Sequence, residues 1–195
     1  MISAVVLAAG KGERMGMPKL FIPLHGKPVL QWTLESVLAT KVTEVICVVR
    51  ELASIRATIS IRDDRLYWLV NDRADDGQSS SVIAGVWAVD PQSKGAILIV
   101  GDQPLRGSQL INALIERGKI SSAPIIAPSF QRQLRNPVLF RREMFLELLK
   151  LTGDSGGQAL IEKYPDQLEI LQWDEEAPFM EVDDQKDYER IQVLA

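Results

Sequence analysis

The sequence has little cysteine and histidine, no excess of positive charge and no long apolar run. Cys47 is the only cysteine, which excludes an intrachain disulfide and favours a cytoplasmic protein. Its apolar neighbours indicate a buried strand, where a cysteine acts as a small apolar residue. The single histidine, His25, lies in a turn and is interpreted as a surface residue. We therefore expect no chemistry that depends on a thiol or an imidazole.

Charge and hydropathy argue against two classes of partner. The net charge of −4 at pH 7 does not favour general affinity for nucleic-acid backbones, because such binding calls for a basic face. No apolar run approaches the length of a membrane-spanning helix. We expect neither nucleic acid nor a membrane as a partner, so local basic residues or metal ions must neutralise any phosphate ligand.

The apolar pattern predicts an α/β fold, because short β-rich runs alternate with stretches of helical periodicity. No linker or repeat divides the chain, so we expect one domain over residues 1–195, a three-layer α/β/α sandwich around a mainly parallel sheet. The expected strands are Ser3–Ala8, Glu44–Arg50, Leu66–Val70, Ala96–Val100, Ile125–Ala127, Val138–Phe140, Leu168–Trp173 and Phe179–Asp183. The expected helices are Pro28–Leu38, Leu52–Ile61, Ser81–Val89, Ser108–Gly118, Arg141–Leu151, Gly157–Tyr164 and Gln185–Val193.

The loop after the first strand has the composition of a phosphate-binding loop. Its pattern is Leu7-Ala8-Ala9-Gly10-x-Gly12-x-Arg14-Met15-Gly16-x-x-Lys19. Glycines let backbone amides approach phosphate oxygens, and Arg14 and Lys19 neutralise charge that amides cannot. Gly16 comes one residue late for the dinucleotide fingerprint, and no Gly-Lys-Ser/Thr triplet follows, as a Walker A loop requires. The loop therefore indicates a nucleotide-using enzyme outside those two classes.

Two carboxylates follow expected strands and are candidates for binding a divalent cation. Asp102 follows the aliphatic run that ends at Val100, and Asp183 ends the last expected strand. Ligands of α/β sheets bind at the carboxyl ends of strands, and one hard cation that bridges phosphates commonly uses one or two carboxylates plus water. Ser108 is expected to cap the helix after Asp102, which leaves that aspartate free to bind Mg²⁺. Asp183 has an alternative role in helix capping, which its neighbour Asp184 could also perform.

The polar segment Asp75–Ser81 supports two interpretations. As the start of a helix it is a cluster of capping residues, with at least one serine as the N-cap. Alternatively, Gly77, Gln78, Ser79 and Ser80 contact the base and ribose of a nucleotide while the helix start faces a phosphate. The two readings are compatible.

Six segments occur in the order expected for a known enzyme family. They are Leu7–Lys19, Asp76–Ser81, Gly101–Pro104, Asn136–Phe140, Gly153–Gly157 and Val182–Asp183. In these segments the chain resembles the nucleotidyltransferase family that contains molybdenum cofactor cytidylyltransferase and the synthase of molybdopterin guanine dinucleotide. The resemblance implies a Rossmann-like nucleotidyltransferase fold and Mg²⁺ as cofactor. It also implies transfer of a nucleoside monophosphate from CTP or GTP to the terminal phosphate of molybdopterin, with release of pyrophosphate.

The resemblance also implies roles for individual residues. The implied catalytic residues are Arg14, Lys19 and Asp102, and the implied metal ligands are Asp102 and Asp183. The implied nucleotide contacts are Leu7, Ala8, Ala9, Gly10, Gly12, Arg14, Lys19, Gly77, Gln78, Ser79, Ser80 and Asp102. The implied acceptor contacts are Gln103, Asn136, Pro137, Gly153, Asp154 and Gly156. Ala9 favours CTP, since guanylyl relatives more often carry glycine there, and a molybdoenzyme that receives the product is an implied partner.

Two departures from the family pattern bear on the acceptor. Gln158 stands where the family often has arginine, and the segment Ser129–Arg135 lacks the usual glycines. Alternative functions are therefore a nucleotidyltransferase that acts on a sugar phosphate or alcohol phosphate, and a non-catalytic protein that delivers a pterin cofactor. A phosphate nucleophile is anionic near neutral pH, so the proposed transfer requires no general base and depends on positioning and electrostatics.

Overall fold

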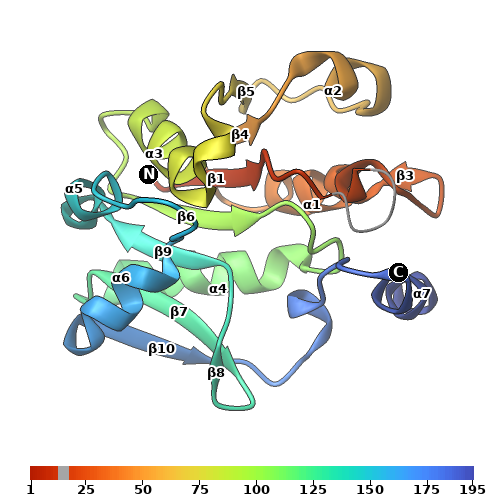
Figure 1. Cartoon of the computed structure of the whole chain (residues 1–195). Coiled ribbons are helices and arrows are strands. Elements are labelled where there is room, and N and C mark those ends of the chain that lie inside the picture. Colours follow the sequence, from red (N-terminus) through yellow and green to blue (C-terminus); the bar gives the residue numbers. More distant parts are fainter. Residues whose placement is uncertain (13–17) are drawn as a thin grey trace.

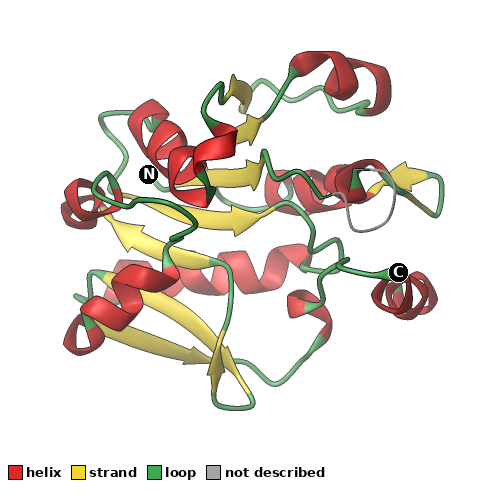
Figure 2. Ribbon diagram, viewed as in Figure 1, coloured by secondary structure: helices red, strands yellow, loops and turns green. Residues whose placement is uncertain are grey.

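The centre of the main sheet is built from short aliphatic segments that are buried on both faces, as inner parallel strands require, whereas the outer segments Leu66–Val70 and Leu168–Gln172 are partly exposed. The computed structural model describes residues 1–12 and 18–195, and within them it places helices on both sides of this sheet (Figure 1 and Figure 2). The strands are β1 Ser3–Ala8, β2 Pro23–Leu24, β3 Lys27–Pro28, β4 Glu44–Val49, β5 Leu66–Val70, β6 Gly95–Val100, β7 Ile125–Phe130, β8 Gln133–Leu134, β9 Val138–Arg141 and β10 Leu168–Gln172.

The main sheet has the strand order β10-β7-β9-β6-β1-β4-β5, with β8 paired to β7. Strand β1 lies between β4 and β6 and is parallel to both. Strand β9 is antiparallel to β6 and to β7, so the sheet is mixed but mostly parallel. The carboxyl ends of β1 and β6 therefore reach the same edge, to the right in Figure 1.

Two layers of helices cover the sheet. The α-helices are α1 Val29–Leu38, α2 Leu52–Thr58, α3 Gln78–Ala88, α4 Gly107–Ile120, α5 Phe145–Leu148, α6 Gln158–Lys163 and α7 Gln185–Leu194. Residues of α1 and α4, such as Leu34 and Leu114, pack on one face. Residues of α3 and α6, such as Val82 and Leu160, pack on the other. Single 3₁₀ turns lie at Lys19–Phe21, Ala74–Asp76, Arg142–Met144, Pro165–Gln167 and Ala177–Phe179. The predicted three-layer α/β/α class is confirmed.

Helix α7 forms a small apolar cluster of its own with the β2–β3 hairpin, beyond the edge of the sheet. The buried residues of this cluster include Leu24, Val182 and Ile191. Two polar contacts join α7 to the hairpin. The Tyr188 hydroxyl donates to the Pro23 carbonyl at 2.6 Å, and His25 Nε2 lies 2.7 Å from the Gln192 carbonyl. This cluster anchors the segment that precedes α7 near the carboxyl ends of the strands. No described helix has the length and apolar character needed to cross a bilayer.

Several predicted boundaries are correct. The strands Ser3–Ala8 and Leu66–Val70 are as expected, Cys47 is fully buried in β4, and Asp184 caps α7 by accepting a bond from the Asp187 amide at 2.9 Å. Other segments are shorter than expected, because Leu52–Ile61 is helical only to Thr58 and Arg141–Leu151 holds a 3₁₀ turn and the short α5.

The predicted ends of α4 are wrong. Arg106 occupies the N-cap, no side chain caps the helix, and Ser108 lies within its first turn. Gly118 does not end the helix, which continues to Ile120. A Cβ on Gly118 would lie 3.2 Å from Leu139 Cδ1, so the glycine serves close packing of α4 on β9 rather than termination.

The predicted serine N-cap of α3 and the predicted last strand are also wrong. Gly77 is the N-cap of α3, and Ser80 Oγ donates to the Gly77 carbonyl at 2.8 Å from within the first turn. The segment Phe179–Asp183 holds the end of a 3₁₀ turn followed by an extended chain. Its Val182 amide donates to the Asp102 carbonyl at 3.0 Å, beyond the end of β6, so it pairs with a turn rather than with a strand.

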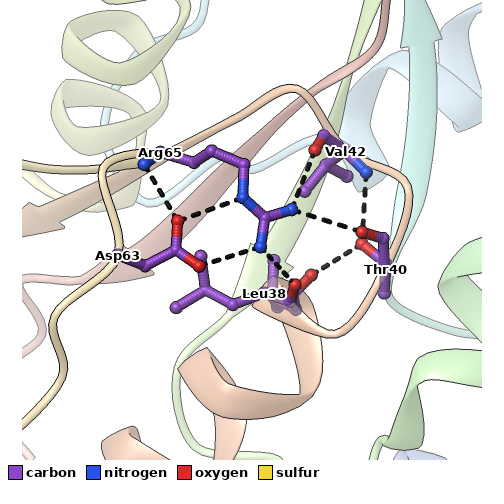
Figure 3. Close-up of polar contacts among 6 residues, drawn as sticks. Leu38, Thr40, Val42, Asp63 and Arg65 are labelled. Atoms are coloured by element: carbon purple, nitrogen blue, oxygen red, sulfur yellow. Dashed lines mark hydrogen bonds and ion pairs between the residues drawn. The ribbon is translucent and has the colours of Figure 1, made fainter.

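At the opposite edge of the sheet, where the parallel strands begin, lies an arginine whose three guanidinium nitrogens all donate hydrogen bonds (Figure 3). Arg65 lies just before β5 and pairs with Asp63 through Nε at 3.0 Å and Nη2 at 2.8 Å. It also donates to the carbonyls of Leu38, Thr40 and Val42, at and after the end of α1. A cation is favourable at a helix C-terminus, where carbonyls lack helical partners. Arg65 therefore fastens α1 to the sheet.

Candidate functional site

A cleft of about 1190 Å³ opens at the carboxyl ends of β1, β4 and β6. Its lining includes many of the predicted nucleotide-binding residues, namely Leu7, Ala8, Ala9, Gly10, Gly12, Lys19, Gly77, Gln78 and Asp102. Ser79 and Ser80 do not line it, because Ser79 is buried and Ser80 Oγ bonds the Gly77 carbonyl. Arg14 lies outside the described residues.

Two glycines explain how the backbone of the first loop approaches the cleft. A Cβ on Gly10 would have no heavy atom of the described residues within 4 Å, so these residues leave space for a ligand beside this backbone. Gly12 has a φ of +56°, and a Cβ there would lie 3.0 Å from Lys19 Cγ. The left-handed conformation and the close approach of Lys19 both favour glycine at position 12.

Lys19 joins the two carboxylates that were predicted from distant parts of the sequence. Its Nζ lies 2.6 Å from Asp102 Oδ2 and 2.7 Å from Asp183 Oδ1. Burial opposes the charge of Lys19, but the charge of Asp102 and hydrogen bonds to both aspartates raise its pKa above the ordinary value. A stable ammonium therefore lies between the two carboxylates.

Glu181 belongs to the same cluster and was missed by the sequence analysis. Carboxylate oxygens of Asp102, Glu181 and Asp183 all lie within 4.8 Å of one another. Burial, together with the charges of Asp102 and Asp183, raises the pKa of Glu181. The signal was present in the sequence, because residues two apart in an extended chain face the same side, as Glu181 and Asp183 do.

The cluster has the chemistry of a site for a hard divalent cation. Carboxylate oxygens are the ligands that Mg²⁺ and Ca²⁺ prefer. Asp102 Oδ1 is buried and has no hydrogen-bond partner among the residues that the structure describes. A buried acceptor without a partner costs free energy, which a bound cation would recover. The residues present therefore fit such an ion.

Behind the cluster lies a buried polar pair, Gln103 and Arg106. Gln103, which was predicted to contact the acceptor, is 2% exposed, and its Nε2 donates to Glu181 Oε1 at 2.7 Å. Its Oε1 accepts a bond from Arg106 Nη2, which also donates to the Val100 carbonyl at 3.1 Å. Burial lowers the pKa of Arg106 to about 10, while Asp102 and Glu181 act in the opposite direction, so the guanidinium stays charged at neutral pH.

A second pocket of about 310 Å³ adjoins the cleft and collects most of the other predicted acceptor residues. Asn136, Asp154 and Gly156 line it, together with Gln158, whereas Pro137 and Gly153 are not part of its lining. Gln78 lines both cavities.

The two cavities are joined by a close contact between their loops. The Ser79 amide donates to the Gly153 carbonyl at 3.1 Å, and a Cβ on Gly77 would lie 2.3 Å from that oxygen. Gly77 also has a φ of +99°, so only glycine fits this junction without strain. The arrangement provides one space for a nucleotide, an adjacent space for a second substrate, and a charged cluster beside them.

The MobA-like NTP transferase domain family matches residues 4–168 of the chain. Among the similar proteins, the purine catabolism protein PucB of Bacillus subtilis (strain 168) is 30% identical over 164 residues, which cover 80% of this chain and 78% of PucB. A probable molybdenum cofactor guanylyltransferase of Thermococcus sibiricus (strain DSM 12597 / MM 739) is 26% identical over 180 residues, 88% of each chain.

A solved structure supports the same grouping. The crystal structure of Rv0371C in complex with manganese, from Mycobacterium tuberculosis H37Rv, superposes with a TM-score of 0.82 at 26% identity. It covers 100% of this chain and 99% of that one. The fold of this chain is therefore shared with that protein over its whole length.

Proposed function

The chain belongs to the MobA-like NTP transferase family and is a nucleotidyltransferase, and on that premise we propose that it transfers CMP from CTP to the terminal phosphate of a molybdopterin-type acceptor. Pyrophosphate is the second product. A molybdoenzyme then receives the nucleotide-bearing cofactor. Among the relatives, one is named a probable molybdenum cofactor guanylyltransferase, which supports the acceptor class.

One observation carries the proposal: Lys19 lies between Asp102 and Asp183 at the mouth of a glycine-lined cleft. Transfer of a nucleotidyl group concentrates negative charge on the reacting phosphate and on the leaving pyrophosphate. Preorganised cations beside these groups lower the barrier, since they need not reorganise during the reaction. A pure carrier of a pterin cofactor has no need of this arrangement.

The residues of the cleft divide the work of binding and positioning. The open backbone at Gly10 receives the phosphates of the nucleotide, and Lys11 and Arg50, which share Asp75 at 3.2 Å and 2.9 Å, add positive charge at the cleft wall. Asp102 and Asp183 would hold Mg²⁺, with Lys19 neutralising the reacting phosphate. When bound, the cation supplies Lewis-acid stabilisation of the phosphoryl oxygens and orients them. Arg14, outside the described residues, keeps its proposed role at the phosphates.

CTP is proposed as the donor because of Ala9. This residue is 3% exposed and lines the cleft, and the guanylyl relatives more often carry glycine at its position. We infer that the base lies against this part of the cleft, where the added methyl group would narrow the space and favour a pyrimidine. Exchange of Ala9 for glycine is therefore expected to improve the use of GTP relative to CTP.

The acceptor pocket favours keeping a second candidate. Among the described residues, its lining holds no lysine or arginine, and it includes Asp154 and Glu162. Such a lining contacts an acceptor by hydrogen bonds, which suits the hydroxyl groups of a sugar phosphate or alcohol phosphate as well as a pterin. The choice of acceptor must therefore be tested together with the choice of nucleotide.

The deciding experiment is Mg²⁺-dependent release of pyrophosphate with each of the four nucleoside triphosphates. Each is combined with molybdenum cofactor, a sugar phosphate or an alcohol phosphate. We expect release with CTP and molybdenum cofactor, and a loss of about 10³-fold for Asp102→Asn with an unchanged fold. The matched control is Asp63→Asn at the opposite edge of the sheet, which should keep full activity. Near-normal turnover by Asp102→Asn, or release with other acceptors only, would contradict the proposal.

A further inference from the structure

We propose that Glu181 is a third carboxylate ligand of the divalent cation and that Arg106 positions it through Gln103. The inference rests on the proposed cation site of Asp102 and Asp183. It adds a ligand that the sequence analysis did not include and two buried residues whose role is to orient that ligand.

Arg106 lies where elementary electrostatics disfavours a cation. It is the largest fully buried side chain among the described residues, with 1% exposed, and it occupies the N-cap of α4. A helix N-terminus carries partial positive charge, and burial of an ion costs free energy unless partners compensate it. The nearby carboxylates of Asp102 and Glu181 and the hydrogen bonds from Nη2 to the Val100 carbonyl and to Gln103 Oε1 act in favour of its charge. A cation in so unfavourable a place is explained if the cluster requires it.

The amide of Gln103 can have only one orientation. A guanidinium has donors and no acceptor, whereas a carboxylate has acceptors and no donor. Gln103 Oε1 must therefore face Arg106 Nη2, and Nε2 must face Glu181 Oε1, which it meets at 2.7 Å. Because Gln103 is 2% exposed, it has no alternative partner in solvent. The fixed guanidinium thus sets the direction in which the Glu181 side chain is held.

An indirect link leaves Glu181 free to bind a cation. A direct pair with arginine is frequently bidentate and occupies both carboxylate oxygens. Gln103 donates one hydrogen bond to Oε1, so the second oxygen of Glu181 stays available. The Val182 amide, bonded to the Asp102 carbonyl at 3.0 Å, holds the same segment against the Asp102 turn.

The charges of the site agree with this assignment. Three carboxylates, those of Asp102, Glu181 and Asp183, face two cations, Lys19 and Arg106. If Lys19 turns to the nucleotide phosphates, one divalent cation together with the fixed Arg106 balances the three carboxylates. The two-carboxylate site of the sequence analysis would carry one positive charge too many in that state.

The test measures binding of Mn²⁺ alone by electron paramagnetic resonance, without nucleotide or acceptor. Glu181→Gln keeps the acceptor for Gln103 but removes the charge, and we expect Mn²⁺ affinity to fall about 10- to 100-fold. Gln103→Met breaks the link and should weaken binding about tenfold. The double variant should bind as weakly as Glu181→Gln alone, because Gln103 acts through Glu181. The charge-matched control is Glu143→Gln, which removes an exposed carboxylate outside the cluster. This variant should bind Mn²⁺ as the native chain does.

Arg106 is tested by a conservative pair of variants. Arg106→Lys keeps the charge and a donor for Gln103 and should retain most Mn²⁺ affinity, whereas Arg106→Met should lose about as much as Gln103→Met. If Arg106→Met does not fold, the cycle of Gln103 and Glu181 variants decides the matter.

Three results would overturn the inference. They are native-like Mn²⁺ affinity in Glu181→Gln, additive losses in the double variant, and no saturable Mn²⁺ binding by the native chain. Failure of the proposed function is a separate result, since a chain that binds Mn²⁺ as expected but releases no pyrophosphate contradicts the reaction and not the site.

Discussion

Two arginines at opposite edges of the sheet have contrasting surroundings. Arg65, at the edge where the parallel strands begin, uses all three guanidinium nitrogens to bond Asp63 and the carbonyls around the end of α1 (Figure 3). Arg106, at the edge where they end, is more deeply buried, yet its Nε and Nη1 have no partner among the described residues. The positive charge of Arg65 is favourable at the C-terminus of α1, whereas the positive charge of Arg106 is unfavourable at the N-terminus of α4.

The difference separates structural charge from functional charge. At the Arg65 edge, Arg65 and Asp63 are paired with each other inside the protein, so this pair needs no ligand to complete it. At the Arg106 edge, the protein holds carboxylates and cations close together, and Asp102 Oδ1 is buried without a hydrogen-bond partner in the part of the chain that the structure describes. Incomplete pairing of this kind is unstable by itself and is typical of sites that bind an ion or a charged substrate.

Among the variants that test this contrast between the two edges, the largest effect is expected for Lys19. Lys19→Gln should lower nucleotidyl transfer about 10²-fold, because the reacting phosphate loses its ammonium partner. The same change should strengthen binding of Mn²⁺ in the absence of nucleotide, since Asp102 Oδ2 and Asp183 Oδ1 lose the group that now occupies them. Pyrophosphate release and Mn²⁺ resonance measure the two effects.

The matched control is Lys41→Gln, which removes an ammonium from an exposed pair with Glu116 at 2.8 Å. It should change neither transfer nor Mn²⁺ affinity. If Lys19→Gln weakens Mn²⁺ binding instead of strengthening it, the view that Lys19 competes with the cation is wrong.

A smaller effect is expected for a change at Arg65, which should lower thermal stability and leave activity unchanged. Arg65→Met removes bonds to the carbonyls of Leu38, Thr40 and Val42, so thermal unfolding monitored by circular dichroism should shift down by about 2–4 °C. Transfer activity below that temperature should stay at the native level. Arg62→Met, an exposed neighbour, controls for loss of charge and should leave the unfolding temperature unchanged. A loss of activity in Arg65→Met would remove the distinction between the two edges.

The smallest expected effect is the contribution of Glu147 to the pH dependence of stability. Hydrogen bonds from Lys150, Lys163 and Tyr164 lower the pKa of Glu147 from 4.5 to about 2. Because the folded pKa lies below the unfolded one, this carboxylate stabilises the fold above about pH 4.5 and loses that contribution as the pH falls through 2. In Glu147→Gln the unfolding temperature should be lower at pH 6 and should fall less steeply between pH 4.5 and 2. Equal slopes for the native and variant chains would contradict the assignment.

The sequence analysis predicted those parts of the fold and site that depend on local pattern. The aliphatic run before Gly101 is unmistakably a central strand, so Asp102 at its end could be placed correctly, and Lys19 could be assigned to the same edge from the glycine loop. Boundaries were missed where packing overrides local preference. A glycine such as Gly118 is typical of a helix end, but α4 continues past it to Ile120. The glycine is explained instead by the close contact that it allows with Leu139.

The parts of the site that were missed depend on contacts between distant segments. Gln103 was assigned to the acceptor from the family resemblance, and only its burial between Arg106 and Glu181 indicates a positioning role. Arg106 itself received no role in the sequence analysis. Its role is inferred from its burial in the folded chain, which the local sequence pattern does not predict.

By itself, the sequence determined the α/β class, the glycine-lined loop and the presence of carboxylates at strand ends, because strand and loop preferences act over a few residues. Only the tertiary structure decided which charges meet. Lys19 and Asp183 are 164 residues apart, and Gln103 and Glu181 are 78 apart. Such pairs form because the sheet order and the packing of α7 on the β2–β3 hairpin bring the end of the chain back to the Asp102 turn. The chemistry of each residue is local, but the site exists only where the fold assembles them.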